Sequence, residues 1–479
     1  MTALHEHDAA AIKALRDLGP ETPNWVPPRP GIDHDVAVVG GGQCGIATVF
    51  ALRQAGIGSV ALYDAGDAAR PGIWLTRARM HTLRTIKDIS GPELHNPALG
   101  FRAWFEARHG QAAFEALTRI ARTDWAEYLL WFRRIAGVTP RQRTRLTRIE
   151  PADDHLRLHL EHDGAPSVET ARRVVLATGY PGGGAIVIPE LVREGLPPSA
   201  YDHTDAEIDF SRFRGRRVAI LGAASAAFDN AAAALEAGAA EVRLFCRQRD
   251  LQRHGVGTAS MYQGVSDNFH HLPDAVRWQL APLIRARGIF PTPPVVARAT
   301  RFPNFHIHLA APWQAVRQRG EHVEIDFPGG RVEVDHVLLA TGYHMGPHLR
   351  PELADFADQI ELWGHRPGLP PIANGTAIGR FPYLGPYYEY RERVPGSAPF
   401  LGRIQALNLS ALVSFARHVG DIASLKVAVP RAVRGISRGL FLEDAGHHLA
   451  RISQPATEEL PRSSYEGAIV GGGTLEAAE

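Results

Sequence analysis

Two places in the chain combine a short apolar run, a glycine- or alanine-rich turn and a helical stretch. The segment Asp35-Val-Ala-Val-Val-Gly-Gly-Gly-Gln-Cys-Gly45 precedes a helical pattern over 46–55. The segment Arg217-Val-Ala-Ile-Leu-Gly-Ala-Ala-Ser-Ala-Ala227 precedes another over 228–237. Short, nearly continuous apolar runs are typical of strands buried in a parallel sheet. The pattern therefore predicts two strand–turn–helix units.

Each unit continues in the same order. A second strand pattern follows, and later comes a hairpin signal, in which alternating residues flank Asp163-Gly164 or Gly329-Gly330. Nearly identical heptapeptides close the two units, Val174-Val-Leu-Ala-Thr-Gly-Tyr180 and Val337-Leu-Leu-Ala-Thr-Gly-Tyr343. This duplication predicts an α/β protein with two Rossmann-like dinucleotide-binding domains.

The first glycine turn has the G-x-G-x-x-G spacing of a dinucleotide site. Gly40 permits the tight turn, Gly42 lets the backbone approach a pyrophosphate, and Gly45 allows close packing of helix on strand. Asp64 ends the second strand roughly 20 residues later, where an acid accepts hydrogen bonds from a ribose. We interpret this turn as a dinucleotide site; the alternative is a purely structural glycine-rich turn.

The second turn departs from that spacing. Gly222 fills the first glycine position, whereas Ala224 and Ala227 fill the other two. The strand that follows leads into Arg247 and Arg249 instead of an acid, and arginine favours the 2′-phosphate of NADPH over NADH. The alternatives left open are a solvated arginine pair and NADH as the cofactor.

Composition and charge exclude several classes of protein. The 479 residues suffice for about three domains. Lys and Arg total 52 and Asp and Glu total 51, which excludes a globally basic nucleic-acid binder. No apolar run approaches the ~18–20 residues of a membrane span, and the polar start is no secretory signal. We therefore expect a cytoplasmic protein that binds neither nucleic acid nor membrane.

The sequence lacks the residues that several other catalytic chemistries require. The chain has two cysteines and no C-x-x-C, which excludes a disulfide-reductase mechanism. Histidines with metal-ligand spacing are missing, so we expect no metal site. Ser225 lies on a strand-to-helix turn but without the G-x-S-x-G of a hydrolase.

The chain resembles the single-component flavin-dependent monooxygenases, which include flavin-containing, Baeyer–Villiger and N-hydroxylating monooxygenases. The resemblance covers roughly residues 33–430 and rests on the first glycine turn, Gly72-Ile-Trp74, both Ala-Thr-Gly strand ends and the turn with Ser225. It implies FAD on the first fold and NADPH on the second. The implied domains are a 1–32 arm, a 33–180 FAD part, a 181–204 linker, a 205–345 NAD(P) domain inserted in the FAD domain, a 346–452 second FAD part and substrate loop, and a flexible 453–479 tail.

The resemblance also implies roles for individual residues. Trp74 lies beside the flavin, and Arg84, Thr85 and Lys87 contact the flavin edge or the substrate; a solvated loop is the alternative. A helix N-terminus at Asn408–Ser410 points at the flavin. The complete set of expected cofactor residues is Gly40, Gly42, Gly45, Asp64, Trp74, Thr85, Thr178, Gly179, Gly222, Ser225, Ala227, Arg247, Arg249, Thr341, Gly342, Asn408 and Ser410.

Two segments are less regular. The family's F-x-G-x-x-x-H linker survives only as His203, which indicates a divergent branch; His203 either couples NADP to the flavin or is a plain loop residue. The loop at 381–390 is rich in tyrosine, and Tyr383, Tyr387 and Tyr388 suit the wall of a planar substrate. The alternative is a plug between domains.

The function that follows is an NADPH-using, FAD-dependent monooxygenase. The resemblance implies that reduced FAD captures O2 as a C4a-(hydro)peroxyflavin and passes one oxygen to a small nucleophilic substrate, an amine or heteroatom compound or a nitrogen-rich heterocycle such as urate. The alternatives are a flavoprotein reductase without oxygenation and a non-catalytic redox-sensing protein. The sequence leaves the oligomeric state open and is compatible with a homodimer.

Overall fold

The computed structural model describes residues 2–17, 22–254, 262–287, 290–454 and 458–470. Its strands are β1 (His34–Val39), β2 (Val60–Tyr63), β3 (Thr144–Pro151), β4 (Leu156–His162), β5 (Ala165–Gly179), β6 (Gly184–Ile186), β7 (Tyr201–His203), β8 (Arg217–Leu221), β9 (Glu241–Phe245), β10 (Phe305–His308), β11 (Ala315–Arg319), β12 (His322–Phe327), β13 (Gly330–Val334), β14 (His336–Leu339), β15 (Tyr343–Met345) and β16 (Ile404–Asn408).

The helices are α1 (Thr2–Asp17), α2 (Gln43–Gln54), α3 (Phe101–His109), α4 (Gln111–Ala116), α5 (Arg122–Ile135), α6 (Glu190–Gly195), α7 (Ser225–Glu236), α8 (Gln263–Asn268), α9 (Asp274–Arg287), α10 (Pro293–Thr300), α11 (Gly375–Gly379), α12 (Leu412–Phe415), α13 (Ile422–Glu443) and α14 (Ala445–Ile452). Within the described residues, no helix is both long and apolar enough to cross a membrane.

The first sheet joins early and late parts of the chain. β1 lies between β2 and β5, and both pairings are parallel. The second half of β5 also pairs in parallel with β16, whereas its first half forms the predicted hairpin with β4. Helices α2 and α13 pack side by side on this sheet and share its apolar core. The late strand β16 therefore completes the sheet that β1 begins.

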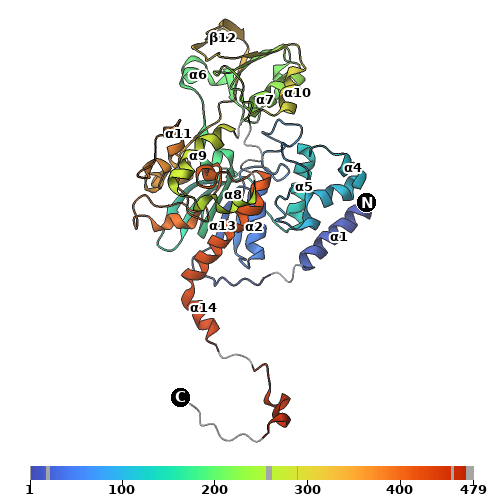
Figure 1. The fold of residues 1–479 in the computed structure, drawn as a ribbon, viewed down its shortest axis with the longest axis vertical. Coiled ribbons are helices and arrows are strands. Elements are labelled where there is room, and N and C mark those ends of the chain that lie inside the picture. The colour runs from blue at the N-terminus through green and yellow to red at the C-terminus, as the bar shows by residue number, and fades with distance from the viewer. Residues whose placement is uncertain (1, 18–21, 255–261, 288–289, 455–457, 471–479) are drawn as a thin grey trace.

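The second sheet repeats the parallel arrangement. Its order is β10-β9-β8-β14-β7, and β7 at its edge lies inside the segment predicted as a linker. Helices α7 and α10 cover it, and the antiparallel sheet β11-β12-β13 holds the second predicted hairpin. These elements lie at one end of the molecule in Figure 1. The α/β class and both strand–turn–helix units are thus confirmed, while the domain boundaries stay a prediction.

A helical insertion was not visible in the sequence pattern. Helix α9 follows the second strand of the second fold, yet it packs on residues from the later part of the chain. Trp278 stacks on Trp363 with ring centroids 6.2 Å apart, and both belong to a core with Phe381. This insertion therefore connects the second fold to the segment that leads back to the first.

The chain's ends differ from the simple arms expected. The predicted 1–32 arm begins with helix α1 over 2–17, and Asp8 accepts a hydrogen bond from the Trp131 indole at 2.7 Å. The segment after α1 lies against the body through Trp25, whose indole N–H bonds the Ala55 carbonyl. Of the predicted tail, residues 455–457 and 471–479 lie outside the described part of the chain.

A buried group of ion pairs fixes the C-terminal end of α13. The Arg172 side chain is fully buried and donates to the Asp444 carboxylate at 2.8 Å. Arg29, from the N-terminal arm, donates to the other oxygen of Asp444 at 2.7 Å. Arg173 donates to Glu443 at 2.9 Å. Three segments of the chain that are distant in sequence thus meet at Asp444. A charge left without a partner here would keep its full desolvation cost.

We predict that Asp444→Ala lowers the free energy of unfolding by about 3–5 kcal/mol, because it leaves Arg172 buried without its closest partner. Asp154→Ala removes an exposed partner of Arg29 at 3.3 Å and should cost less than about 1 kcal/mol. Urea unfolding of the FAD-loaded chain, followed by tryptophan fluorescence, measures both. Similar losses in the two variants would contradict a special role for the buried group.

The ion pairs of Asp444 with Arg29 and Arg172 also make the stability of the fold depend on pH. Burial would raise the pKa of Asp444, but the hydrogen bonds and charges of Arg29 and Arg172 outweigh it and hold the pKa below its ordinary 3.8. A lowered carboxylate pKa contributes stability above pH 3.8 that is lost as the pH falls through the folded-state value. The difference in free energy of unfolding between the native chain and Asp444→Ala should therefore narrow only as the pH falls below 3.8.

Candidate active site

The two folds end their first strands in the same strained way. Gly40 has φ +107°, and a Cβ on it would collide with the Ala177 carbonyl oxygen at the end of β5. Gly222 has φ +121°, and its Cβ would meet the Ala340 carbonyl after β14. Each turn therefore needs glycine, because the backbone of the closing heptapeptide runs directly against it.

The remaining glycines of the first turn have different reasons. A Cβ on Gly45 would strike the Gly40 carbonyl, so this glycine is required by helix–strand packing. A Cβ on Gly42 would meet nothing closer than the Cα of Gly72, at 3.6 Å. The fold itself therefore does not require glycine at position 42. The space it leaves, beside the N-terminus of α2, fits a cofactor pyrophosphate.

Other predicted FAD residues surround this space. Gly42 caps α2 without a side-chain acceptor from the described residues, so the first N–H groups of the helix are available to phosphate oxygens. The Asp64 carboxylate accepts hydrogen bonds from the N–H groups of Gly41 and Gly66, which fixes it over the turn. Trp74 is half-buried, and its ring meets the edge of Trp125 at 6.4 Å. Asp64 and the α2 N-terminus fit the adenosine and pyrophosphate parts of FAD, and a contact of Trp74 with the flavin stays a prediction.

The second turn presents a similar helix end. Ser225 begins α7, and its hydroxyl donates to the Phe290 carbonyl at 2.9 Å. Ala227 is fully buried in the second core. Arg247 and Arg249 follow β9 and are exposed. Their pairing with a 2′-phosphate stays a prediction.

The two strand ends bring the folds together. Gly179 and Gly342 have φ +69° and +77°, and the tyrosines after them, Tyr180 and Tyr343, lie with ring centroids 6.2 Å apart. Thr341 donates to the Val187 carbonyl, which ties the second strand end to the connecting segment. The duplicated heptapeptides thus meet through their last residues.

Asn408 holds the end of β5 in place. Its side chain is fully buried and lies 3.3 Å from the Leu176 carbonyl, the Thr178 hydroxyl and the Gly182 carbonyl. Its oxygen accepts from the Ser410 N–H at 2.9 Å. The predicted helix start at Asn408–Ser410 is a 3₁₀ turn, capped by Asn408, that continues directly into the short helix α12. The long helix α13 begins at Ile422, because Ala416 and Gly420 take positive φ angles and interrupt the chain.

The loop between α12 and α13 carries further residues that the sequence pattern did not indicate. Asp421 caps α13 by accepting a hydrogen bond from the Ser424 N–H at 2.8 Å. The loop before it carries His418, whose ring lies 4.6 Å from that of Tyr180. Gln43 at the start of α2 donates to the Gly420 carbonyl at 2.6 Å. Only the Asp-x-x-Ser capping pattern at 421–424 could have indicated this helix start.

His203 is buried and His418 is half-buried beside the tyrosine pair. Burial lowers the pKa of His418, although Asp421 opposes the change, and its Nε2 lies 3.5 Å from the Asp421 carboxylate. Burial also lowers the pKa of His203, whose Nδ1 accepts the Asp205 N–H at 3.1 Å. Neither Nε2 has a hydrogen-bond partner among the described residues. Both rings are therefore neutral near pH 7.

The loop predicted to line the flavin also connects the two folds. Arg84 pairs with Asp229 of α7 at 2.8 Å, and Asp229 is buried. Burial raises the pKa of Asp229, with Arg84 and Arg298 opposing. Lys87 donates to the carbonyls of Phe114 and Glu115 at 2.8 and 2.9 Å, and Thr85 is half-buried. Arg84 and Lys87 thus have structural partners, and their contacts with flavin or substrate stay predictions.

The tyrosine-rich loop is mostly packed inside the protein. The Tyr383 hydroxyl lies 3.0 Å from both Arg277 and Asp274 of α9. Tyr388 is buried and stacks on Phe415 with centroids 4.0 Å apart, while Tyr387 is half-buried. This packing agrees with the alternative of an inter-domain plug. A contact of these tyrosines with substrate stays a prediction.

Comparison with known proteins adds independent findings. A family model described as FAD-NAD(P)-binding matches residues 37–181. An FAD-dependent urate hydroxylase of Xanthomonas campestris pv. campestris is 39% identical over 425 residues, which cover 88% of this chain and 89% of that protein. In the described part of the chain, no group of three or more His, Cys, Asp or Glu could hold a metal ion.

Solved structures share the fold at low sequence identity. The ornithine hydroxylase of Pseudomonas aeruginosa is 18% identical with a TM-score of 0.65, covering 86% of this chain and 99% of that one. A bacillithiol disulfide reductase of Bacillus cereus is 14% identical with a TM-score of 0.54, covering 85% and 99%. Hydroxylases and reductases thus share this architecture, so the fold alone does not select between them.

We predict that Gly42→Ala separates cofactor binding from folding. The added methyl group fits the protein, so the thermal unfolding midpoint of the cofactor-free chain should not change. It crowds the cofactor, so the dissociation constant for FAD should rise roughly ten- to a hundred-fold. Fluorescence titration of the cofactor-free protein with FAD measures this.

Two further glycines serve as comparisons. Gly402→Ala, at a position with nothing within 4 Å, should change neither property. Gly40→Ala should lower the unfolding midpoint even without FAD, because it meets the Ala177 carbonyl. If Gly42→Ala binds FAD as the native chain does, the cofactor does not occupy this space.

Proposed function

The chain belongs to the flavin monooxygenase family that includes the FAD-dependent urate hydroxylase, and we propose that it hydroxylates urate or a closely related planar, nitrogen-rich heterocycle. It is an FAD-dependent monooxygenase, and the 39% identity over 88% of the chain is the observation that carries the proposal for its substrate. We further propose that it works in the cytoplasm as an NADPH-dependent enzyme, with Arg247 and Arg249 selecting NADPH over NADH.

FAD supplies the redox chemistry when bound: it takes two electrons from NADPH and activates O2, so that one oxygen atom enters the substrate and the other leaves as water. The chain's own residues bind and orient. The turn at Gly42 and the α2 N-terminus hold the pyrophosphate, and Asp64 faces the ribose. Asn408 and Thr178 keep the end of β5 in the position that the flavin needs.

Hydroxylation of urate requires a group that accepts one proton. The ring carbons of urate carry no hydrogen, so adding a hydroxyl group to a ring carbon requires a proton to leave from a ring nitrogen. His418 suits this task, because burial keeps its imidazole neutral and its Nε2 has no hydrogen-bond partner among the described side chains. Asp421, 3.5 Å away, would stabilise the imidazolium that forms.

The location of His418 supports this role. It lies at the carboxyl ends of β5 and β16, where open α/β sheets bind their ligands. The neighbouring Val419 N–H bonds the Asn408 carbonyl at 3.1 Å, so the loop is attached to the end of β16. The Tyr180 ring lies tilted against the imidazole, is 46% exposed and offers a planar surface of the kind that a flat heterocycle packs against.

We predict that urate accelerates NADPH oxidation by the FAD-loaded enzyme and that O2 and NADPH are consumed one to one without matching release of hydrogen peroxide. Oxygen-electrode and absorbance traces, together with a peroxide assay, measure the coupling. Urate turnover with 18O2 should place one labelled oxygen in the product. If NADPH oxidation releases a matching amount of hydrogen peroxide, with urate and with related purines alike, the reductase alternative is favoured. If NADPH does not reduce the flavin at all, the redox-sensor alternative is favoured.

We predict that His418→Asn lowers kcat/KM for urate by about 10²–10⁴-fold, because a general base is lost. Flavin reduction by NADPH should remain within about two-fold of the native rate, since the variant keeps the cofactor site. In the native enzyme the acid limb of kcat/KM should lie below pH 6.5, the ordinary histidine value, and it should vanish in the variant. His306→Asn, which changes an exposed histidine of β10, is the control. An unchanged pH profile in His418→Asn would exclude this histidine as the base.

A further inference from the structure

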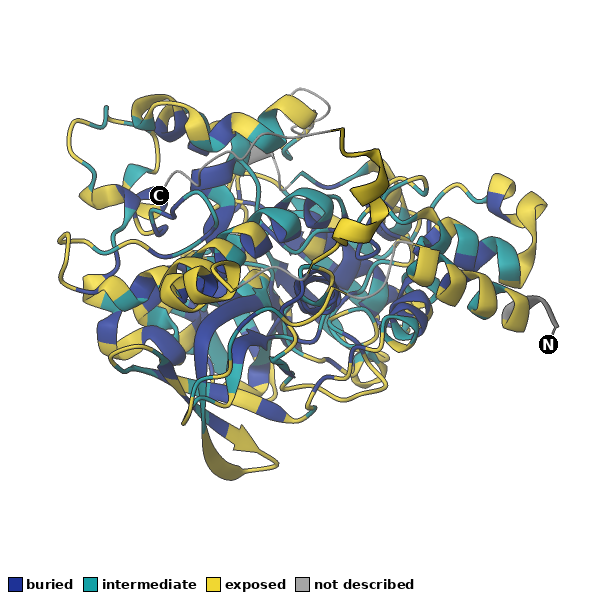
Figure 2. Cartoon of the chain, turned by 90° about the horizontal axis from the view of Figure 1, so that it is seen from below, coloured by how far each residue is buried: buried dark blue, intermediate teal, exposed yellow. Residues whose placement is uncertain are grey.

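The last part of the described chain leaves the body of the molecule. Helix α14 extends from the end of α13 away from both sheets (Figure 1), and exposed residues dominate this region in the view of Figure 2. Within α14 only His448 is buried, and its ring stacks on that of Phe441 with ring centroids 4.3 Å apart. We call the described residues 445–454 and 458–470 the C-terminal arm.

The arm is apolar as well as exposed. Every described residue from 449 to 470 is exposed. Leu449 is 68% and Ile452 77% exposed, and both lie on one face of α14 because they are three residues apart. The other large apolar side chains of the arm that are exposed are Leu460, Tyr465, Ile469 and Val470. Such a concentration of exposed apolar groups marks an interaction surface.

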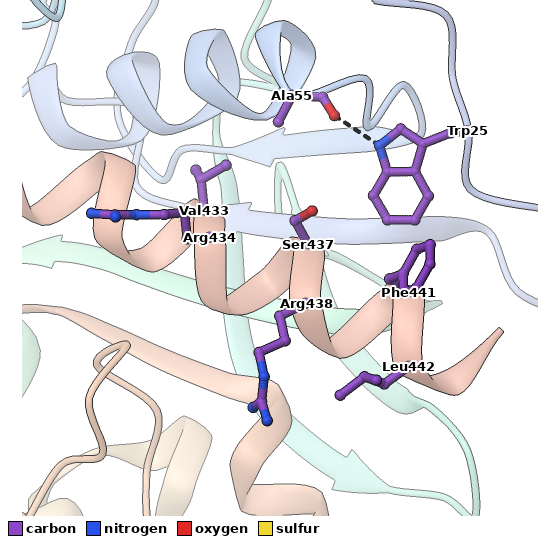
Figure 3. A pocket seen from close by; sticks show the side chains of 8 residues that line it. All are labelled: Trp25, Ala55, Val433, Arg434, Ser437, Arg438, Phe441 and Leu442. Atoms are coloured by element: carbon purple, nitrogen blue, oxygen red, sulfur yellow. Dashed lines mark hydrogen bonds between the residues drawn. The ribbon is translucent and has the colours of Figure 1, made fainter. Parts of the chain in front are cut away.

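A groove opens beside the root of the arm. It has a volume of about 430 Å³ and lies between the N-terminal segment, the end of α2 and one face of α13. Figure 3 shows its lining, which is Trp25, Ala55, Val433, Arg434, Ser437, Arg438, Phe441 and Leu442. A second hollow continues past Val433 toward Phe50 and Pro430. The molecule therefore carries an exposed apolar helix face and an unfilled apolar groove.

Charge and rigidity indicate what fills this groove. Arg434 and Arg438 are exposed on it, whereas the arm carries three exposed acids (Glu458, Glu459 and Glu466) against two exposed arginines (Arg451 and Arg462). The buried contacts of Asp444 with Arg172 and Arg29 fix the point where α14 leaves the body. The arm is therefore directed outward, its apolar side chains match the apolar lining of a groove of its own sequence, and its small excess of acids is opposite in sign to the two groove arginines.

We propose that the C-terminal arm of a second copy of this chain occupies the groove, and that the two copies exchange arms about a two-fold axis. A two-fold axis makes the exchange reciprocal, so both apolar faces and both grooves are covered at once. Leu449 and Ile452 of one copy lie against Trp25, Phe441 and Leu442 of the other. The enzyme is then a dimer whose contact lies away from the glycine turns.

Sedimentation equilibrium of the FAD-loaded full chain tests this. The native chain should be a dimer at micromolar concentration. The double variant Leu449→Glu/Ile452→Glu should raise the dissociation constant of the dimer at least about 100-fold, because four buried apolar side chains are lost per dimer. The matched control His447→Glu/Ala450→Glu adds the same two acids to the opposite face of α14 and should remain dimeric.

A mixing experiment identifies the groove as the partner of the arm. Ser437→Arg fills the groove but leaves the arm intact, so this variant alone should be monomeric. Mixing it with Leu449→Glu/Ile452→Glu joins an intact arm to an intact groove, and a heterodimer should form. A monomeric native chain, a dimer that both double variants leave intact, or a mixture that stays monomeric would each overturn the proposal.

The variants can also be checked for correct folding. FAD content and the rate of flavin reduction by NADPH should match those of the native chain in all of them, because the arm and the groove lie outside the cofactor site. A variant that loses FAD together with the dimer would show that the change had disturbed the fold, and that variant would count against an independent arm contact.

Discussion

The contact of Gly40 with the Ala177 carbonyl is the constraint on which the cofactor site depends. The turn after β1 runs so close to the end of β5 that even a Cβ on Gly40 would collide with the Ala177 carbonyl oxygen. The approach brings the N-terminus of α2 to the end of β5, where Thr178 and Asn408 meet. The chain repeats this contact at Gly222 and Ala340, which is why the two heptapeptides are almost identical: each must pass directly under a glycine with a positive φ angle.

Charged side chains hold the two folds in one relative position. Asp229 is buried at the junction and pairs with Arg84 from the first fold, while Asp205 accepts hydrogen bonds from Arg77 and from the Tyr343 hydroxyl. Removing one partner of a buried pair costs more than the pair contributes. These contacts therefore specify one arrangement of the folds more than they add stability, and the arrangement brings Tyr343 against Tyr180.

The sequence predicted what is local and repeated. The glycine turns, the strand ends and both hairpins depend on neighbouring residues, so their spacing revealed them before the structure did. What it could not predict depends on distant contacts. Lys87 looked available for ligand, yet its ammonium bonds carbonyls of a helix that begins 24 residues later in the chain. The role of His418 depends on β16 returning to β5, and no pattern in its own neighbourhood indicates that pairing.

Hydroxylases and reductases share this fold, so its architecture alone does not distinguish them. In this chain Tyr180, Tyr343 and His418 lie where the two folds meet. A reductase needs only a path for hydride from one dinucleotide to the other, and a water-filled gap between the folds does no harm. An oxygenase must also keep water from the flavin while it holds a substrate. Here two strand ends place aromatic rings at the junction, and the neutral, half-buried imidazole of His418 lies beside them. Aromatic rings and neutral imidazoles among the ion pairs of this junction offer a planar surface and a proton acceptor, which hydroxylation of a substrate that must lose a proton needs and hydride transfer does not.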